Sequence, residues 1–599
     1  MDSMPHHSQL TRALTIGLAI IPACLILALI LKWGVDTPYS DEWHYAAFFE
    51  SFSEGTLTLS DLFAQQNEYR QFFPNLIIVG LGWLTKWDLR GELLVSFALA
   101  CLVSFNIYRL GKLTVGGSPA QRWGSYFLAN LLIFSPVQYE NWLLGMQLIY
   151  FMPVACLTTC LSIAYSQLDA RVKFLSCMCL ATISTFSSAN GILCWLIVLP
   201  LLTWPNSRRE LLEKKWLTLA WVAGFVLNAA LYFNDYQKPQ THPALTEVLI
   251  HPMKALGHFL TLLGKALELG DVIFLRNRSG TGHLIVAAAT GLTLVALFIA
   301  SALRIRRDGR LAYRAAGWLI LGAYSIMTAF LVTVGRAGFG VEQALSSRYT
   351  TFTLYLPVAL IHLLPLMLER HVAGDRFAGK RKMLLPVLAS ILILSHLLIY
   401  LFNVREMSAL STGLLQRKAC SLFINVIRED CLTKKVYPNF EYLIRVVNKL
   451  DGLGYLRPGL VNSSRVQDIE AASADNPEHY GSSDSVTQTG EGVYTAVGWA
   501  VLPQRGGAAD AILLTYDRAD GNSVIFALTD TGEERNIVAR ILRRGSPPDY
   551  SSWQKSFSVS GLSTNPLIIR AWAFDARTGK AFKLTGTHII RNPNAITGN

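Results

Sequence analysis

DTPYSDEWHYAAFFESFSEGTLTLSDLFAQQNEYRQFFP, residues 36–74, directly follows the first long apolar run of the chain. The stretch is acidic and aromatic, with an Asp-Glu pair at residues 41–42 and the polar group NEYR at residues 67–70. Carboxylates beside a membrane span cost free energy, so their presence there needs a reason. The first question is therefore on which side of the membrane this stretch lies.

Composition indicates an integral membrane protein. Of the 599 residues, 52% are hydrophobic and only 16% are charged, against about 25% charged residues in soluble domains. The net charge is +12, but the Lys and Arg residues form short clusters between apolar runs. That distribution follows the positive-inside rule, so we expect no nucleic-acid partner.

Eleven apolar runs are long enough to cross a membrane at about 20 residues each. They lie near residues 13–31, 91–110, 121–137, 146–166, 172–188, 190–204, 216–233, 283–303, 313–334, 350–368 and 383–403. Two further apolar stretches, 72–87 and 250–269, are short or interrupted by Pro, His and Lys.

The charge of the loops decides whether residues 72–87 and 250–269 are membrane spans. If both doubtful stretches are excluded as spans, the basic loops near residues 109–122, 171–173, 208–215, 304–314 and 370–382 all fall inside, and the acidic 36–74 loop falls outside. We therefore predict about eleven transmembrane helices, with 72–87 and 250–269 as interfacial or re-entrant helices on the outer face. The first span is predicted to be uncleaved, with the N-terminus before it in the cytoplasm. The C-terminus is predicted to be extracytoplasmic.

The predicted domains follow from this topology. They are a transmembrane domain (1–403) with a first outer loop (32–90), an extracytoplasmic helical segment (404–461), a polar linker (462–491) and a C-terminal β-sandwich (492–599). Short alternating runs separated by turn signals predict the β-sandwich.

Cysteine usage fits this division of the chain. Seven of the nine cysteines lie in apolar runs and are read as small buried hydrophobes. Cys420 and Cys431 lie outside the spans, where an extracytoplasmic location makes a disulfide between them plausible. No Cys pair has His or Asp companions, so no metal site is predicted, although a divalent metal is not excluded.

Asp41 and Glu42 open a short helical pattern that includes His44. A carboxylate pair on an outer-face helix could deprotonate an acceptor hydroxyl, because partial burial raises a carboxylate pKa toward the working range. A helix N-terminal cap, with Ser40 and acidic first-turn residues, fits the same sequence equally well.

Further polar residues stand near the predicted outer ends of the spans. Arg70 could hold a phosphate, or it could anchor the interface together with its neighbouring Tyr. Arg336 and Arg348 stand out because outer loops are otherwise poor in Arg; they could bind a lipid-linked phosphate, or form salt bridges to Glu342 or to a first-loop carboxylate. The remaining candidates for substrate binding on this face are His44, Asn67, Glu68, Glu140, Gln147 and Tyr349.

Motifs for nucleotide-dependent or hydrolytic chemistry are absent. The sequence has no Walker loop, GxSxG elbow, HExxH or strand-linked GxGxxG motif. An enzyme built in this way would have to take an activated donor from the lipid phase.

The segment SDEWHYA after the first span resembles the acidic motif of GT-C glycosyltransferases, in their protein O-mannosyltransferase and aminoarabinose-transferase branches. NEYRQFFPNL occupies the place of a His/Pro-containing segment in those families. The resemblance implies a polyprenyl-phosphate-sugar donor, Asp41 as general base with support from Glu42, and Arg70, Arg336 and Arg348 as candidates for the donor phosphate. It also implies a carbohydrate- or acceptor-binding role for the β-rich tail.

We therefore expect an inverting glycosyltransferase of a bacterial inner membrane that acts on an extracytoplasmic glycan, lipid or protein acceptor. The alternatives are a non-catalytic flippase or transporter of lipid-linked glycans, and an O-antigen ligase or polymerase. A flippase should line its path with charge through the membrane, whereas here the carboxylates concentrate on one face.

Overall fold

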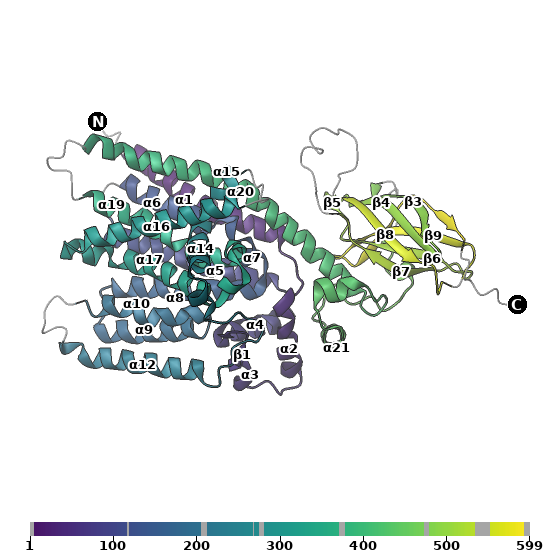
Figure 1. The fold of residues 1–599 in the computed structure, drawn as a ribbon, viewed down its shortest axis with the longest axis horizontal. Coiled ribbons are helices and arrows are strands. Elements are labelled where there is room, and N and C mark those ends of the chain that lie inside the picture. The colour runs from purple at the N-terminus through teal and green to yellow at the C-terminus, as the bar shows by residue number, and fades with distance from the viewer. Residues whose placement is uncertain are drawn as a thin grey trace. The chain divides into compact units, whose positions relative to one another are not determined.

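A computed structural model describes residues 5–116, 119–204, 212–267, 269–274, 281–369, 378–472, 479–532, 551–562 and 564–591. Arg208, Arg209, Arg370 and Arg376 of the predicted inner loops lie outside these ranges. The chain forms two compact units (Figure 1). The helical unit contains Met1–Gly34, Thr58–Gly80 and Arg90–Met407, and the mixed unit contains Val35–Leu57, Leu81–Leu89 and Ser408–Asn599.

Each of the eleven predicted apolar runs forms a helix. Within the described ranges, seven regions meet the length and hydropathy of a membrane span. Their main helices are α5 (Arg90–Thr114), α8 (Leu148–Ala164), α12 (Lys215–Phe233), α16 (Gly282–Ile305), α17 (Gly309–Arg336), α19 (Tyr355–Glu369) and α20 (Ala378–Leu422). The other four runs form α1 (Pro5–Trp33), α6 (Pro119–Ile133), α9 (Ala170–Thr185) and α10 (Leu193–Leu202). The short helices are α3 (Leu59–Phe63), α7 (Tyr139–Leu143), α13 (Glu247–Ile250), α15 (Leu269–Ile273) and α18 (Thr350–Thr353).

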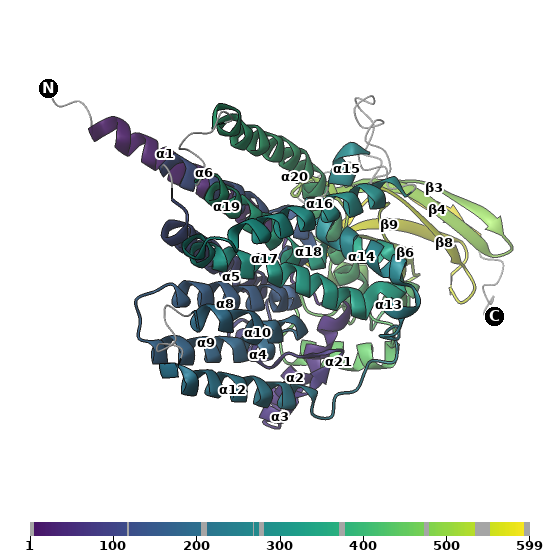
Figure 2. The same cartoon turned by 60° about the vertical axis from the view of Figure 1, so that its left-hand side comes forward.

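The two doubtful stretches form α4 (Phe72–Thr85) and α14 (Pro252–Lys265), of 14 residues each. At 1.5 Å per residue such a helix is about 21 Å long, shorter than the roughly 30 Å hydrocarbon core. Helix α14 packs against α16 (Figure 2), where a Cβ on Gly264 or Gly291 would lie 1.8 or 1.9 Å from a backbone oxygen of the other helix. Glycine at both positions therefore allows the two backbones to touch.

Hydrogen bonds show which helix ends of the helical unit lie together. Arg314, near the start of α17, donates from Nε to the Thr114 carbonyl at the end of α5, at 2.8 Å. Tyr165, just after α8, donates to the Tyr313 carbonyl at 2.6 Å. The ends of α5 and α8 therefore meet the start of α17, and Arg336 lies at the opposite end of that helix. This arrangement agrees with the alternation of basic loops read from the sequence.

In the mixed unit, the start of the first loop packs on the segment after the last span. The loop forms η1 (Ser40–His44) and α2 (Tyr45–Ser53), and the later segment forms η8 (Leu432–Val436) and α21 (Phe440–Gly452). Arg445 and Lys449 of α21 pair with Glu50 and Glu54 at 2.8 and 2.7 Å. The opposite face of α21 buries apolar side chains such as Val446.

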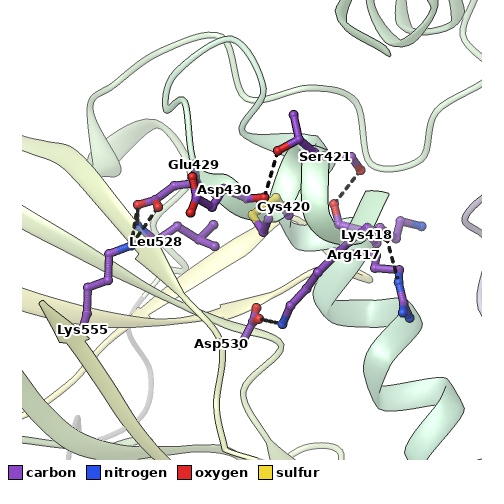
Figure 3. Close-up of a disulfide and its surroundings, with 12 residues drawn as sticks. Arg417, Lys418, Cys420, Ser421, Glu429, Asp430, Leu528, Asp530 and Lys555 are labelled. Atoms are coloured by element: carbon purple, nitrogen blue, oxygen red, sulfur yellow. Dashed lines mark hydrogen bonds and ion pairs between the residues drawn. A yellow bond between two sulfur atoms is a disulfide. The ribbon is translucent and has the colours of Figure 1, made fainter. Parts of the chain in front are cut away.

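The predicted disulfide between Cys420 and Cys431 is confirmed (Figure 3). Its Cα atoms are 6.3 Å apart, within the range that a disulfide allows. Next to it, both carboxylate oxygens of Glu429 accept hydrogen bonds from Lys555 Nζ, at 2.8 and 2.7 Å. The Leu528 amide donates to Glu429 at 3.1 Å, so the disulfide loop is fixed to the β-rich region.

The C-terminal region is β-rich, as predicted, and consists of two antiparallel sheets. The first sheet contains β3 (Gly481–Gly490), β4 (Val493–Leu502), β5 (Gly507–Ala508) and β8 (Ser552–Ser558). The second contains β6 (Ala511–Asp517), β7 (Ser523–Thr529), β9 (Leu567–Asp575), β10 (Lys580–Lys583) and β11 (His588–Ile590). Side chains from both sheets, among them Phe557 and Ile569, share one hydrophobic core.

The prediction of a polar linker over 462–491 is wrong in its described parts. Residues 481–490 form β3, which pairs with β4 along its length. Ser464 accepts a backbone hydrogen bond from Ile525 at 2.7 Å. The Ser-rich composition suggested a flexible segment. Strand β3 lies at the edge of its sheet and its C-terminal half is largely exposed, so polar side chains are compatible with the strand and composition alone could not distinguish it from a linker.

Helix α4 ends in a strained turn. The Trp87 amide donates to the Gly82 carbonyl at 3.0 Å, as in a Schellman motif, whose left-handed position is usually glycine. Here Lys86 occupies that position with φ +56°, and Trp87 follows with φ +54°. A left-handed conformation costs a residue with a Cβ roughly 1–2 kcal/mol.

The strain at Lys86 gives a stability prediction. Lys86→Gly removes the Cβ penalty, whereas Lys86→Ala retains it, and both remove the ammonium that lies 5.5 Å from the Tyr455 ring. We expect the glycine variant to be more stable than the alanine variant by about 1 kcal/mol, measured by thermal unfolding in detergent. Equal stability of the two variants would show that the turn is not strained.

The disulfide gives a second prediction. In protein purified without reductant, Cys420→Ser should expose Cys431 to thiol labelling and lower the unfolding free energy by about 2–4 kcal/mol. The matched control is Cys24→Ser, which should leave Cys431 unlabelled. Labelling of Cys431 in the unreduced wild type would contradict the pairing.

Candidate functional site

A two-residue turn presents Glu68 in the helical unit. Strands β1 (Gln65–Gln66) and β2 (Tyr69–Arg70) pair antiparallel, with Gln66 opposite Tyr69. Two-residue hairpin turns require positive φ, and Asn67 supplies it with φ +51°. Asparagine tolerates this conformation better than most residues, so the sequence Asn67-Glu68 places the carboxylate at the tip of the turn.

Glu68 forms an ion pair with Arg336 at the end of α17. Both side chains are mostly buried, with exposed fractions of 19% and 20%. His242 lies beside them: its Nδ1 is 3.5 Å from the second oxygen of Glu68, and its Nε2 is 3.1 Å from Arg336 Nη1. Because the guanidinium can only donate, His242 Nε2 must accept, which leaves the ring proton on Nδ1, facing Glu68.

The environment keeps His242 neutral. Burial lowers its pKa, and the positive charges of Arg336 and Lys238 lower it further, while Glu68 opposes them. A neutral imidazole is consistent with the tautomer that the hydrogen bonds require. The three side chains therefore carry one negative and one positive charge.

Tyrosine side chains interact electrostatically with this ion pair. Burial raises the pKa of Tyr69 well above its usual value, and Tyr150, Glu68 and Tyr349 raise it further, whereas Arg336 lowers it. Tyr69 therefore stays protonated and can donate a hydrogen bond. These interactions place Tyr150, at the start of α8, and Tyr349 within electrostatic reach of the Glu68–Arg336 pair.

A second carboxylate holds the other outer-loop arginine. Glu140 accepts hydrogen bonds from Ser347 Oγ at 2.7 Å and from the Arg348 amide at 3.0 Å. Arg348 Nε lies 3.9 Å from Glu140 Oε2 and donates to Ser346 Oγ at 3.0 Å. The carboxylate thus caps η7 (Ser347–Tyr349), while the Arg348 side chain remains 42% exposed.

The Arg70 side chain forms hydrogen bonds to backbone carbonyls. Its guanidinium donates to the carbonyls of Tyr232, at 2.8 Å, of Phe63, at 3.2 Å, and of Asn234. It therefore caps the C-terminal end of α12, where helix carbonyls lack partners. We leave Arg70 out of the proposed donor site for this reason.

The remaining predicted residues of the helical unit have more local roles. Asn67 forms the turn, and its carbonyl accepts from Gln65 Nε2 at 2.6 Å. Gln147 has a buried Oε1 with no hydrogen-bond partner among the described residues. Glu342, considered as a partner for Arg336, is exposed.

Asp41, Glu42 and His44 belong to the mixed unit. The Glu42 carboxylate accepts the Tyr39 amide at 2.7 Å and completes a capping box, so the capping interpretation holds for Glu42, with Tyr39 rather than Ser40 at the N-cap. Asp41 and His44 are exposed on the same short helix. Glu42 therefore fixes the helix that presents Asp41.

Sequence reasoning missed His242 and Tyr150. His242 lies in the polar segment between α12 and α13, and Tyr150 lies in the first turn of an apolar helix. The sequence signal that could have identified His242 is a histidine in a predicted outer loop. Nothing in the apolar run around Tyr150 distinguished it from a core residue.

No group of three His, Cys, Asp or Glu residues within the described ranges could hold a metal ion.

No family model matches the chain, and no curated protein matches it in sequence. The structure is similar to two crystal structures of ArnT from Cupriavidus metallidurans, one in the apo state and one bound to undecaprenyl phosphate. Identity is 14% and the TM-score is 0.27 in both cases, over 59% and 61% of this chain and 77% and 80% of theirs. At this TM-score the likeness carries no argument about residues or chemistry.

The interaction energy between Glu68 and Arg336 can be measured with a double-mutant cycle. We expect Glu68→Gln and Arg336→Gln to show a coupling energy of about 1–3 kcal/mol in thermal unfolding, because the charges are in contact and mostly buried. Glu342→Gln is the control: combined with Arg336→Gln it should be additive within about 0.5 kcal/mol. Coupling to Glu342 instead of Glu68 would overturn the assignment.

Proposed function

We propose that the chain is an inverting GT-C-type glycosyltransferase. It moves one sugar from a polyprenyl-phosphate donor to an extracytoplasmic glycan, lipid or protein. The observation that carries the proposal is the pair Arg336 and Arg348, each held by a carboxylate, at the end of the helical bundle opposite its basic loops. Cations there run against the positive-inside pattern and suit a phosphate ligand.

The donor phosphate is proposed to bind at these arginines. Guanidinium groups match phosphate oxygens geometrically, and Arg348 is exposed enough to reach a ligand. The protonated hydroxyl of Tyr69 adds a donor near Arg336. As the bond between the anomeric carbon and the phosphate oxygen breaks, negative charge grows on the leaving phosphate, and fixed positive groups stabilise it.

Asp41 is the proposed general base. It takes the proton of the acceptor hydroxyl while that oxygen attacks the anomeric carbon from the side opposite the leaving phosphate. Glu42 contributes by capping the helix that carries Asp41, so we assign Glu42 a positioning role. His44 and Gln147 remain proposed substrate contacts.

We propose that the protein lies in a bacterial inner membrane with a cytoplasmic N-terminus and an extracytoplasmic mixed unit. The Cys420–Cys431 disulfide supports this location, since disulfides persist in oxidising compartments.

The distribution of buried charge favours an enzyme over a flippase. Among the described Asp, Glu, Lys and Arg residues of the helical unit, the buried ones are Arg70, Glu92 and Lys265. Arg70 lies in the hairpin, Glu92 in the first turn of α5, and Lys265 at the end of α14. A transport path would need charged groups through the middle of the spans.

Asp41→Asn tests the proposed base. We expect transfer from a polyprenyl-phosphate sugar to fall by about 100-fold or more, since general-base catalysis typically contributes 10²–10⁴-fold. Transfer is measured with purified protein in lipid nanodiscs, using a radiolabelled donor and extracted envelope acceptors. The control is Glu54→Gln, which removes a partly exposed first-loop carboxylate paired with Lys449 and should retain full transfer.

Undiminished transfer by a stably folded Asp41→Asn protein would remove Asp41 as base. Failure of the wild type to consume any polyprenyl-phosphate sugar, while it moves a lipid-linked glycan across the nanodisc or liposome bilayer, would favour the flippase.

A further inference from the structure

The short helix that carries Asp41 depends on contacts from outside itself. Helix η1 has five residues (Ser40–His44), and a helix of this length is not stable through its own hydrogen bonds. Asp41 is exposed on η1, whereas Trp43 is buried. The position of the Asp41 carboxylate is therefore set by the groups that contact the backbone and the buried side of this segment.

Two of these contacts precede Asp41 in the sequence, and both come from the segment after the last predicted span. Lys418 Nζ donates a hydrogen bond to the Asp36 carbonyl at 2.7 Å. The Arg417 guanidinium lies over the Tyr39 ring, 4.8 Å from its centroid. Both contacts lie within the mixed unit.

Tyr442 makes a third contact, just after Asp41. Its hydroxyl donates to the Trp43 carbonyl at 3.2 Å. Burial raises the pKa of Tyr442, so the hydroxyl stays protonated and remains a donor. The base is therefore flanked on both sides by contacts to three side chains, Arg417, Lys418 and Tyr442, which we call the clamp.

The two helices that carry the clamp are joined to each other. Arg417 and Lys418 lie near the end of α20 (Figure 3), and Tyr442 lies in the first turn of α21. Asn425 follows α20, and it exchanges side-chain hydrogen bonds with Asn448 of α21 at 2.8 and 3.0 Å. The clamp is thus built on one connected support.

The backbone directly before Asp41 is strained. Ser40 adopts φ +50°, in the left-handed region that residues with a Cβ adopt uncommonly. Such strain persists where surrounding structure enforces it, and it clusters at active sites. The clamp contacts lie on both sides of Ser40 and provide that enforcement.

From these contacts we propose that Arg417, Lys418 and Tyr442 are positioning residues for Asp41. They fix the backbone of residues 36–43, so that the carboxylate meets the acceptor hydroxyl in a productive orientation, and they do not touch the substrate themselves. Misplacement of a catalytic geometry by about 1 Å can cost about 100-fold in rate. The positioning of a base rests on the proposed function, whereas the fixing of η1 does not.

The alternative is that the clamp only stabilises the mixed unit. In that case its loss would lower the stability of the whole unit, and any loss of transfer would be the same with or without Asp41. A positioning role instead predicts a local effect at η1 and a loss of rate that requires Asp41.

Tyr442→Phe tests the positioning role, because it removes only the hydroxyl that reaches the Trp43 carbonyl. We expect kcat for transfer to fall about tenfold or more, with an unchanged acceptor KM. In the Asp41→Asn protein the same substitution should cause no further loss, since two changes that act through one group are not additive. Tyr437→Phe is the matched control. Its ring lies 5.2 Å from that of Tyr442 but outside the clamp, and kcat should stay at the wild-type value.

Hydrogen exchange tests the clamp without any donor. Exchange of the peptide covering residues 36–44 is measured by mass spectrometry on full-length protein in nanodiscs. Tyr442→Phe and Lys418→Met should each speed exchange of this peptide several-fold, because local opening becomes easier when a holding contact is lost. Tyr437→Phe should leave it unchanged. A wild-type thermal unfolding midpoint and an intact disulfide verify the fold of each variant.

The outcomes separate this inference from the proposed function. An unchanged kcat in both clamp variants, or an equal loss with and without Asp41, overturns the positioning role. Unchanged exchange in both variants overturns the fixing of η1. If the wild type consumes no polyprenyl-phosphate sugar, the proposed function fails, and faster exchange confined to residues 36–44 still supports the fixing of η1. If Asp41→Asn retains full transfer, the positioning role falls with the base, and the glycosyltransferase stands.

Discussion

Charged side chains at the edge of an apolar helical bundle must find partners, and this constraint shapes the outer-loop end of the helical unit. Water solvates them only partly there, so an unpaired charge costs several kcal/mol. Glu68 pairs with Arg336, Glu140 binds the amide and side chain of Arg348, and Arg70 binds three backbone carbonyls. Segments distant in sequence are brought together by these pairings. The hairpin of the first loop thereby meets the end of α17, and the loop before α8 meets the loop before α18.

The same pairings account for both stability and proposed chemistry. A carboxylate that holds an arginine in place keeps its guanidinium ordered before a ligand arrives, which reduces the entropy lost on binding. A phosphate must then compete with that carboxylate. Arg336, mostly buried and close to neutral His242, is more tightly held than Arg348, which keeps much of its side chain exposed. The two arginines are therefore suited to different tasks, one fixed and one able to move toward a ligand.

Sequence reasoning was most successful where a strong physical rule applied. Apolar length located the eleven helices, charge alternation separated the two ends of the bundle, and the position of Cys420 and Cys431 outside the spans pointed to their disulfide. For Arg336, the need for a partner was evident, but the sequence left Glu342, a first-loop carboxylate and a phosphate open; only the turn at Asn67 shows why Glu68 reaches it. Arg70 and Glu42 could not be separated from ligand-binding residues, because a capping role depends on which helix end lies nearby. The 481–490 strand was missed because a polar edge strand and a linker have similar composition.

The mixed unit is assembled from residues 35–57, 81–89 and 408–599, and this has a consequence for biogenesis. The first two segments leave the ribosome early, yet the helices that they contact, such as α21, are synthesised more than 300 residues later. Contacts between residues so far apart in sequence form slowly. The aromatic side chains of the first loop therefore stay exposed until the last span has been inserted. Quality control of this protein thus falls at the end of translation. A chain truncated after the last span would lack most of the mixed unit and leave those aromatic side chains available to chaperones and proteases.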